Sequence, residues 1–440
     1  MKKSEINYIN SADIKVEELT PAMGEYLKIK HQNPDKILLY RLGDFYETFF
    51  EDAVTMSKVL EITLTGREQG NFGRIPLAGI PAKAVNGYIE KLVQKNYKVV
   101  ICDQLEDPKF AKGIVKRGVT RIITSGTLTE SDMLNQNSNN YICALYKDEK
   151  NGLWGFSYAD ISTGEFKVTQ APFELILAEL TRISPSEVIG PSKKQDIQPF
   201  QIVPEEKIDL PDEITKIYNC SKIPSSVFNE NFAQNNLKAV FEASSLESFG
   251  YSRYKLGFSC AGALLAYIWE NMKENVPKFE RIEPYELSEY MILDGSTRKN
   301  LELTQTLRDK NKFGSLLWAV DKTGTNMGAR LLKNWICQPL KNVDEILKRQ
   351  NAITELVERN DERINLINLL EQITDIQRLA TRMSNNSANP KDFVSLKSSL
   401  VLLPELLEAA SNFEHNPLET IAQYKDEIAE YTDTIERTIN

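Results

Sequence analysis

A short run near the N-terminus places an aromatic ring two residues before a carboxylate. The run reads Arg41-Leu42-Gly43-Asp44-Phe45-Tyr46-Glu47. Gly43-Asp44 is typical of a turn. In extended chain after a turn, alternate side chains share a face, so Phe45 and Glu47 lie side by side while Tyr46 points into the core. A phenyl ring beside a carboxylate is an unusual surface for binding a polyanion, unless the target is a defect in a base-paired duplex.

Such a pair can select weak base pairs. A phenyl ring that wedges into a base step from the minor groove must unstack it, and unstacking costs least at a mispaired step. A carboxyl held near phosphates has its charged form disfavoured. Protonated Glu47 donates a hydrogen bond to a base, whereas ionised Glu47 repels intact duplex. An isolated Phe-x-Glu triplet is more often a buried ring and a solvated acid at a strand end, so the triplet alone does not establish a site.

The elements around this run alternate between strands and helices, which favours a small mixed sheet with helices against it. Helices are predicted from Thr20-Pro21 and near residues 52–60 and 85–95, and strands at residues 37–42, 45–47, 62–65 and 98–102. The glycine-rich residues 66–74 are predicted to be an irregular loop.

The changes in composition and in predicted secondary structure along the sequence indicate three domains. The polar stretch 135–140 is the first boundary, and strands follow near residues 141–146, 155–160 and 165–168 in a second α/β domain. After about residue 258 helical segments dominate, at residues 264–273, 314–319, 328–335, 343–356, 364–379 and 393–409. We predict α/β domains over residues 1–130 and 131–270, and an all-helical domain over 271–440. Residues 421–440 end without glycine or proline C-cap chemistry, so the sequence looks cut rather than finished, and whether the native protein continues past Asn440 stays open.

Composition narrows the class of protein. The net charge is −9, yet residues 1–126 contain 19 Lys and Arg and only 16 Asp and Glu. Within them, residues 91–121 contain eight basic and three acidic residues. That cluster is either a solvated face or a patch that meets phosphates. Five scattered cysteines and two histidines disfavour disulfides, a zinc site and a histidine-based triad. The sequence has no run of about 18 apolar residues, so no membrane span is predicted. A cytoplasmic protein is expected.

The ordered set of motifs resembles the MutS family of DNA mismatch sensors, over essentially the whole chain. The motifs after Gly43-Asp44-Phe45-Tyr46-Glu47 are PLAGIP at residues 76–81, CDQLEDP at 102–108, KGIVKR at 112–117, DISTG at 160–164, TRKNLEL at 297–303, MGARLL at 327–332 and DIQRL at 375–379. The resemblance implies a mismatch-recognition domain, a ribonuclease-H-like connector and part of a helical core. Departures are modest: Asp103, Ser125, Gln377 and Lys391 stand where the family often has Glu, Pro, Glu and Arg, and Lys83 replaces a common histidine.

The resemblance also implies roles for particular residues. Phe45 would be the wedge and Glu47 the contact to the base of a mismatch or small loop in double-stranded DNA. Contacts to the DNA backbone are expected from five basic residues: Arg67, Arg74, Lys112, Lys116 and Arg117. For Arg67, a phosphate contact and a solvated arginine in a loop are equally good interpretations. Family members couple this binding to ATP and Mg²⁺, form homodimers, contact a MutL-type repair partner and work in the bacterial cytoplasm at the nucleoid.

This chain itself is predicted not to be an enzyme. No G-x-x-x-x-G-K-[S/T] run occurs in it, so we expect no ATP hydrolysis, no cofactor and no metal, and at most weak dimerisation. Two alternatives stay open. A ribonuclease-H-like nuclease needs clustered carboxylates for metal ions, and only Asp160 and Glu165 are candidates; Asp160 more simply caps the turn at 162–164. An acidic scaffold that docks a repair partner is the other.

Overall fold

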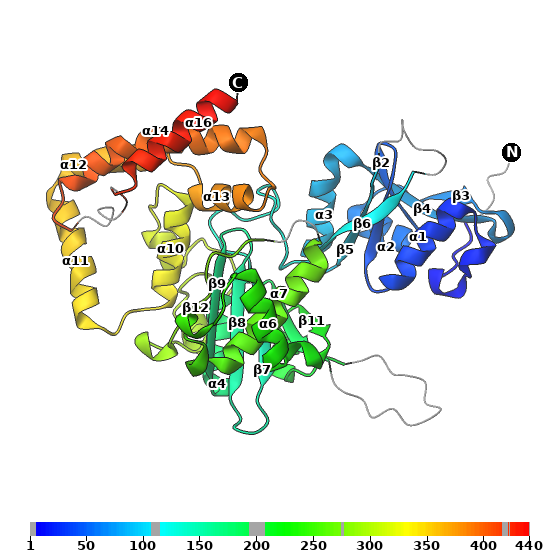
Figure 1. The fold of residues 1–440 in the computed structure, drawn as a ribbon, viewed down its shortest axis with the longest axis horizontal. Coiled ribbons are helices and arrows are strands. Elements are labelled where there is room, and N and C mark those ends of the chain that lie inside the picture. The colour runs from blue at the N-terminus through cyan, green and yellow to red at the C-terminus, as the bar shows by residue number, and fades with distance from the viewer. Residues whose placement is uncertain are drawn as a thin grey trace. The chain divides into compact units, whose positions relative to one another are not determined.

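The computed structural model describes residues 6–106, 115–192, 207–273, 277–415, 421 and 423–439. The chain divides into two compact units (Figure 1). The first comprises Met1–Leu134 with Pro211–Ser221 and Leu265–Val276, and the second comprises Asn135–Leu210, Lys222–Leu264 and Pro277–Asn440. Within the described ranges, no helix is both long and apolar enough to cross a membrane.

The first unit is built on a six-stranded mixed sheet in the order β3-β4-β2-β1-β5-β6. β1 runs parallel to β5, and the other neighbouring strands whose pairing is described run antiparallel. The strands are β1 (Ile37–Leu42), β2 (Phe45–Phe49), β3 (Thr65–Glu68), β4 (Arg74–Pro81), β5 (Val99–Gln104) and β6 (Arg117–Ile123). The helices are α1 (Pro21–Gln32), α2 (Phe50–Leu60) and α3 (Val85–Gln94).

Both faces of this sheet are covered by helices. Tyr26 and Leu27 of α1 belong to one buried cluster with Leu38 and Tyr40 of β1. α2 and α3 belong to a second cluster, which includes Leu39 of β1. A central strand buried on both faces reads as a continuous apolar run rather than an alternating one, which explains the sequence Ile-Leu-Leu-Tyr of β1. The sheet is therefore a rigid base for the hairpin that follows β1.

The second unit begins with another six-stranded sheet, in the order β11-β10-β7-β8-β9-β12. Its strands are β7 (Tyr141–Lys147), β8 (Trp154–Asp160), β9 (Glu165–Ala171), β10 (Glu187–Pro191), β11 (Cys220–Ile223) and β12 (Glu283–Pro284). Helices α4 (Phe173–Ile183) and α6 (Glu230–Val240) accompany this sheet, as does the first part of α7 (Lys255–Met272). α5 (Asp212–Thr215) and the part of α7 from Leu265 onward belong to the first unit. β12 lies in the domain over 271–440 that the sequence predicts to be entirely helical. That detail is wrong, because residues 283–284 add an edge strand to β9.

Helices make up most of the remaining chain. They are α8 (Gly295–Asn300), α9 (Leu316–Val320), α10 (Asn326–Cys337), α11 (Val343–Glu358), α12 (Asn360–Leu370), α13 (Ile376–Ser384), α14 (Pro390–Ser411) and α16 (Lys425–Thr438). The single helix predicted over residues 364–379 is wrong. It divides because the Asp375 side chain accepts a hydrogen bond from the Arg378 amide and so begins a new helix. The prediction of two α/β regions followed by a helical region is confirmed.

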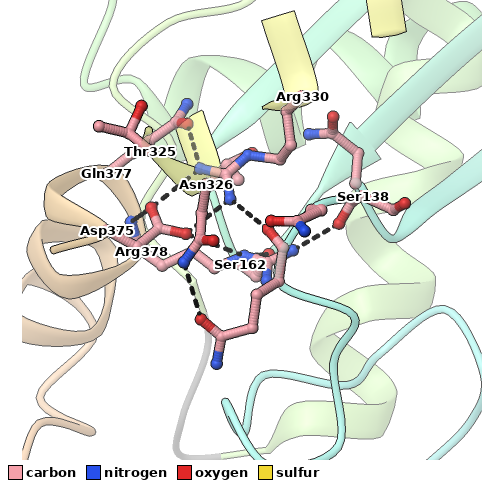
Figure 2. A network of polar contacts seen from close by, with 12 residues as sticks. Ser138, Ser162, Thr325, Asn326, Arg330, Asp375, Gln377 and Arg378 are labelled. Carbon is pink, nitrogen blue, oxygen red and sulfur yellow. Dashed lines mark hydrogen bonds and ion pairs between the residues drawn. The ribbon is translucent and has the colours of Figure 1, made fainter. Parts of the chain in front are cut away.

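Two buried arginines in this helical region bind acceptors from distant parts of the second unit (Figure 2). The first is Arg330 of α10, which is 3% exposed. Its two terminal nitrogens donate to the two carboxylate oxygens of Asp375 at 2.6 and 2.9 Å, a bidentate pair. They also donate to the Gln136 carbonyl at 3.0 Å and the Gln377 amide oxygen at 2.9 Å. Arg330 thus joins α10 and the start of α13 to the chain ahead of β7.

The second is Arg378 of α13, which reaches the same segment. Its guanidinium donates to the carbonyls of Asn135 at 3.1 Å and Ser138 at 2.7 Å, and to the Ser162 hydroxyl at 3.1 Å. We name this pair of arginines with Asp375 the arginine clamp. The sequence singled out both motifs as typical of the family but assigned no role to either arginine, because their main-chain partners lie 194 to 243 residues away along the chain.

The C-terminal helices are expected to be the least stable part of the described chain. α16 has no buried residue, whereas the first four residues of β1 are all buried. Exposed apolar side chains also line α11, α12 and α14, among them Val343, Ile364 and Val401. Amide hydrogen exchange should therefore be faster in residues 425–438 than in 37–47, since local opening exposes little apolar surface there. Slower exchange in α16 than in β1 and β2 would contradict this.

Candidate nucleic-acid interface

A tight turn between β1 and β2 presents the candidate wedge. Leu42 pairs with Phe45, so Gly43 and Asp44 form a two-residue turn. Gly43 has φ +60°, the left-handed value that glycine adopts without strain at the first position of such turns. The Phe45 side chain directly after the turn is 47% exposed. A large apolar ring is thus held in solvent at the tip of a hairpin whose strands are anchored in a central sheet.

Tyr46 points the other way, as predicted. It is 6% exposed and packs in the cluster that includes residues of α2 and α3. Its hydroxyl donates to the Asp103 carboxylate at 2.7 Å, and the Arg41 guanidinium lies over its ring. Burial, together with the hydrogen bond to Asp103, raises the pKa of Tyr46 far above its usual value. Tyr46 therefore fixes the rotation of β2, and this rotation sets the direction of Phe45.

Glu47 is half-buried beside an arginine. Its side chain is 25% exposed, and Nη1 of Arg67 lies 3.5 Å from its Oε2 atom. That oxygen is buried and accepts no hydrogen bond from the residues that the structure describes. Burial raises the pKa of the Glu47 carboxyl, and the positive charge of Arg67 offsets part of the rise. This carboxyl takes up a proton more readily than a surface glutamate does.

Phe45 and Glu47 line the same open hollow, of roughly 450 Å³. Its other lining residues come from the end of α2, the chain after it and the neighbouring strands: Glu61, Ile62, Thr63, Thr65, Leu77 and Gly79. Gly79 stands opposite Glu47 in the sheet, and a Cβ there would lie 3.6 Å from the Glu47 Cγ. The missing side chain leaves room for Glu47 to extend across β4. The shared face predicted for Phe45 and Glu47 is therefore present.

The segment predicted as an irregular loop is instead a second hairpin. β3 and β4 pair from Thr65 to Glu68, which places Arg67 on a strand. The glycines in this stretch serve the hairpin: a Cβ at Gly66 would lie 2.6 Å from the Arg74 side chain, whose Nε donates to the Gly66 carbonyl at 3.1 Å. Gly70 and Gly73 at the turn have positive φ. Arg74 is therefore packed across its own hairpin, while Arg67 reaches towards Glu47.

The remaining basic residues that are candidates for contacts to the DNA backbone differ in their exposure and in their contacts within the protein. Lys116 is exposed just before β6. Arg117 of β6 donates to the carbonyls of Arg41 at 2.8 Å and Val115 at 2.9 Å, and its guanidinium lies over the Tyr40 ring. Lys112 lies outside the described residues. Phosphate contacts from any of the five basic residues stay predictions.

The nuclease alternative is not favoured by the carboxylates that it requires. Asp160 is fully buried and accepts hydrogen bonds from the Ser162 amide and hydroxyl and from Asn139 and Asn140. Glu165 accepts from the Tyr141 hydroxyl at 2.8 Å. In the described part of the chain, no group of three or more His, Cys, Asp or Glu residues is placed to hold a metal ion. Asp160 instead caps the turn after β8.

Comparisons with known proteins agree along the chain. Family models for MutS domain I, MutS domain II and MutS domain III match residues 20–132, 140–280 and 296–440, respectively. The chain is 43% identical over 419 residues to the DNA mismatch repair protein MutS of Acaryochloris marina, covering 94% of this chain and 47% of that protein. The protein of the same name from Alkaliphilus oremlandii is 41% identical over 432 residues, covering 96% and 48%.

The MutS protein of Synechococcus elongatus is 40% identical over 446 residues, covering 99% of this chain and 50% of that protein. The chain thus spans about half the length of these curated relatives. The hairpin that carries Phe45 and Glu47 falls within the first family match. This chain belongs to the MutS family, and it carries the family's domains I, II and III in that order.

Proposed function

We propose that this chain recognises mismatched or unpaired bases in double-stranded DNA, with Phe45 entering the base stack from the minor groove and Glu47 contacting the base. The observation that carries the proposal is the opposite exposure of neighbours on β2: Phe45 is 47% exposed and Tyr46 is 6% exposed. An exposed ring on a rigid hairpin enters a base step without loss of its own packing. The curated relatives are named DNA mismatch repair proteins, which supports the same assignment.

Selection arises from the energy of deforming the duplex. Insertion of a ring between base pairs requires unstacking, at a cost of about a few kcal/mol that falls at a mispaired or unpaired base. Glu47 adds a second criterion. As a neutral acid it donates a hydrogen bond to an exposed base atom, and as a carboxylate it disfavours close approach of an intact duplex.

The coupling of mismatch binding to ATP, the dimerisation and the repair partner are also proposals, and they do not rest on Phe45 and Glu47. In the longer proteins of the family, mismatch binding would be coupled to ATP and Mg²⁺, with a homodimer and a MutL-type partner acting in the bacterial cytoplasm at the nucleoid. We propose that the present chain binds DNA without a cofactor and dimerises weakly or not at all.

Binding by this chain is expected to be weak, selective for mismatches and steeply dependent on salt. The reason is the overall net charge of −9, against which only local basic residues favour phosphates. Competition of paired, G·T-mismatched and one-base-insertion duplexes should be measured between about 50 and 200 mM salt. The logarithm of the binding constant should fall linearly, by about 0.9 per phosphate contacted for each unit of log salt. Equal affinity for paired and defective duplexes throughout this range would overturn the proposed function.

A further inference from the structure

Arg67 is poised between two negative partners, one in the protein and one in the proposed ligand. We propose that Arg67 keeps Glu47 ionised in the free protein and releases it when DNA phosphate takes the guanidinium, so that Arg67 sets the pH range of mismatch discrimination. This inference rests on the proposed function and names a positioning residue that controls the charge of its central acid.

The contact between the two side chains is close enough for charge and too loose for a strong hydrogen bond. Nη1 of Arg67 lies 3.5 Å from Oε2 of Glu47, at the limit for hydrogen bonding. Oε2 accepts no hydrogen bond from the described residues, so this buried oxygen depends on the field of Arg67. The Arg67 side chain is 45% exposed, so solvent and ligands reach it. Its guanidinium also lies 5.8 Å from the centre of the Phe49 ring. The Arg67 guanidinium is therefore positioned by Glu47 and Phe49, and a phosphate group can still bind it and move it away from Glu47.

The surroundings of Glu47 leave Arg67 as the charge that acts on it most. Arg67 belongs to β3, and Gly79 of the intervening β4 places no side chain between the two groups. On β1, Tyr40 stands opposite Glu47. Other charged or titratable groups on the packed elements are Glu61 at the end of α2, Glu68 on β3, Arg74 on β4, and, around Tyr40, Glu25 and Arg117. Burial raises the pKa of Glu47, and Arg67 is the charged group that lowers it.

The proton balance follows from this arrangement. A phosphate oxygen offers the guanidinium a full negative charge and better geometry than the Glu47 contact. Once Arg67 moves, a half-buried carboxylate remains without its cation and beside further negative charge, so it takes one proton from solvent. The neutral acid then donates to the base. Binding should therefore consume at most one proton per site, and discrimination should decline as pH rises through the pKa of Glu47 in the complex.

The first experiment is free of DNA. The Glu47 carboxyl is titrated by carbon NMR in the full chain with labelled glutamate, with Glu47→Gln used to assign the signal. Arg67→Gln should shift the titration of Glu47 to higher pH, because the compensating cation is lost. Lys58→Gln is the matched control: it removes the same charge from an exposed position on α2 of the same unit but leaves Arg67 in place, and the Glu47 titration should not move. An unchanged titration in Arg67→Gln would overturn the inference, whatever the protein binds.

The second experiment adds the mismatched duplex. Proton uptake is measured by calorimetry at one pH in buffers of different ionisation enthalpy. Wild-type protein and Lys58→Gln should take up a fraction of a proton, Arg67→Gln less, and Glu47→Gln none. The salt slope of Arg67→Gln should also be shallower by about 0.9, for one lost phosphate contact. Equal uptake by wild type and Arg67→Gln would refute the exchange of partners. Absence of mismatch preference in the wild type, with the NMR shift still present, would refute the proposed function while leaving the control of Glu47 by Arg67 established.

Discussion

Replacing Phe45 by alanine is expected to abolish the preference for mismatched over paired duplex while leaving affinity for paired duplex nearly unchanged. The ring lines an open hollow and is 47% exposed, so the core loses little when it is removed. Stacking on a base contributes about 1–3 kcal/mol, which corresponds to roughly a 5- to 150-fold preference. No phosphate contact is altered, so the salt slope should stay the same.

Two variants make this result decisive. Phe232→Ala removes a phenyl ring of similar exposure, 41%, from α6 of the other unit, and should leave both discrimination and melting unchanged. Tyr46→Ala should do the reverse of Phe45→Ala, destabilising the protein by roughly 3–5 kcal/mol through loss of a buried aromatic ring. The measurements are competitive binding to paired and G·T duplexes together with thermal melts. If Phe45→Ala melts early, or keeps its full preference, then Phe45 is a packing residue and the wedge mechanism is wrong.

Removal of Asp375 from the arginine clamp is expected to destabilise the protein strongly. Burial alone would raise the pKa of Asp375, but the hydrogen bonds and charge of Arg330 outweigh it and lower that pKa. Asp375→Ala leaves the guanidinium of Arg330 buried without its carboxylate, which typically costs about 3–5 kcal/mol. Because the pKa of Asp375 is lowered on folding, its contribution is present above the ordinary value of 3.8 and is lost as pH falls through the folded value.

Urea unfolding of single and double variants separates charge from packing. Arg330→Met combined with Asp375→Leu removes both charges and should recover part of the loss, because an apolar replacement of a whole buried pair is often tolerated. Asp212→Ala is the control: it breaks an ion pair with Lys216 at 2.7 Å whose members are both exposed, and unfolding should hardly change. An Asp375→Ala protein as stable as the wild type would mean that the clamp carries no net stability.

The hairpin of β1 and β2 was predictable from sequence because its signals are local. Glycine at position 43 marks the turn, and the two-residue period of a strand then decides which of Phe45 and Tyr46 is exposed. The same reasoning predicted β1, since its apolar run is what a strand with both faces buried requires. In these cases the side chain that settles the structure lies within a few residues of the one it affects.

Where the deciding partner is distant, the sequence was misleading or silent. Gly66 in a glycine-rich stretch predicts a loop, but in the structure this glycine leaves room for the Arg74 side chain from the opposite strand. The pairing of Arg67 with Glu47 depends on β3, β4 and β2 lying in that order, which no local period encodes. Arg330 and Arg378 lie in helices whose apolar spacing says nothing of acceptors some two hundred residues away.

The acceptors that the arginine clamp selects have a bearing on how this protein tolerates mutation. Arg330 and Arg378 bind the main-chain oxygens of Asn135, Gln136 and Ser138, and every amino acid supplies that atom. A change of side chain at residues 135, 136 or 138 therefore leaves these arginine contacts available, as long as the backbone ahead of β7 keeps its path. A substitution of Arg330, Arg378 or Asp375 would instead remove the donors, or the carboxylate that holds one of them. The path of residues 135–138 therefore depends on side chains encoded about two hundred residues downstream.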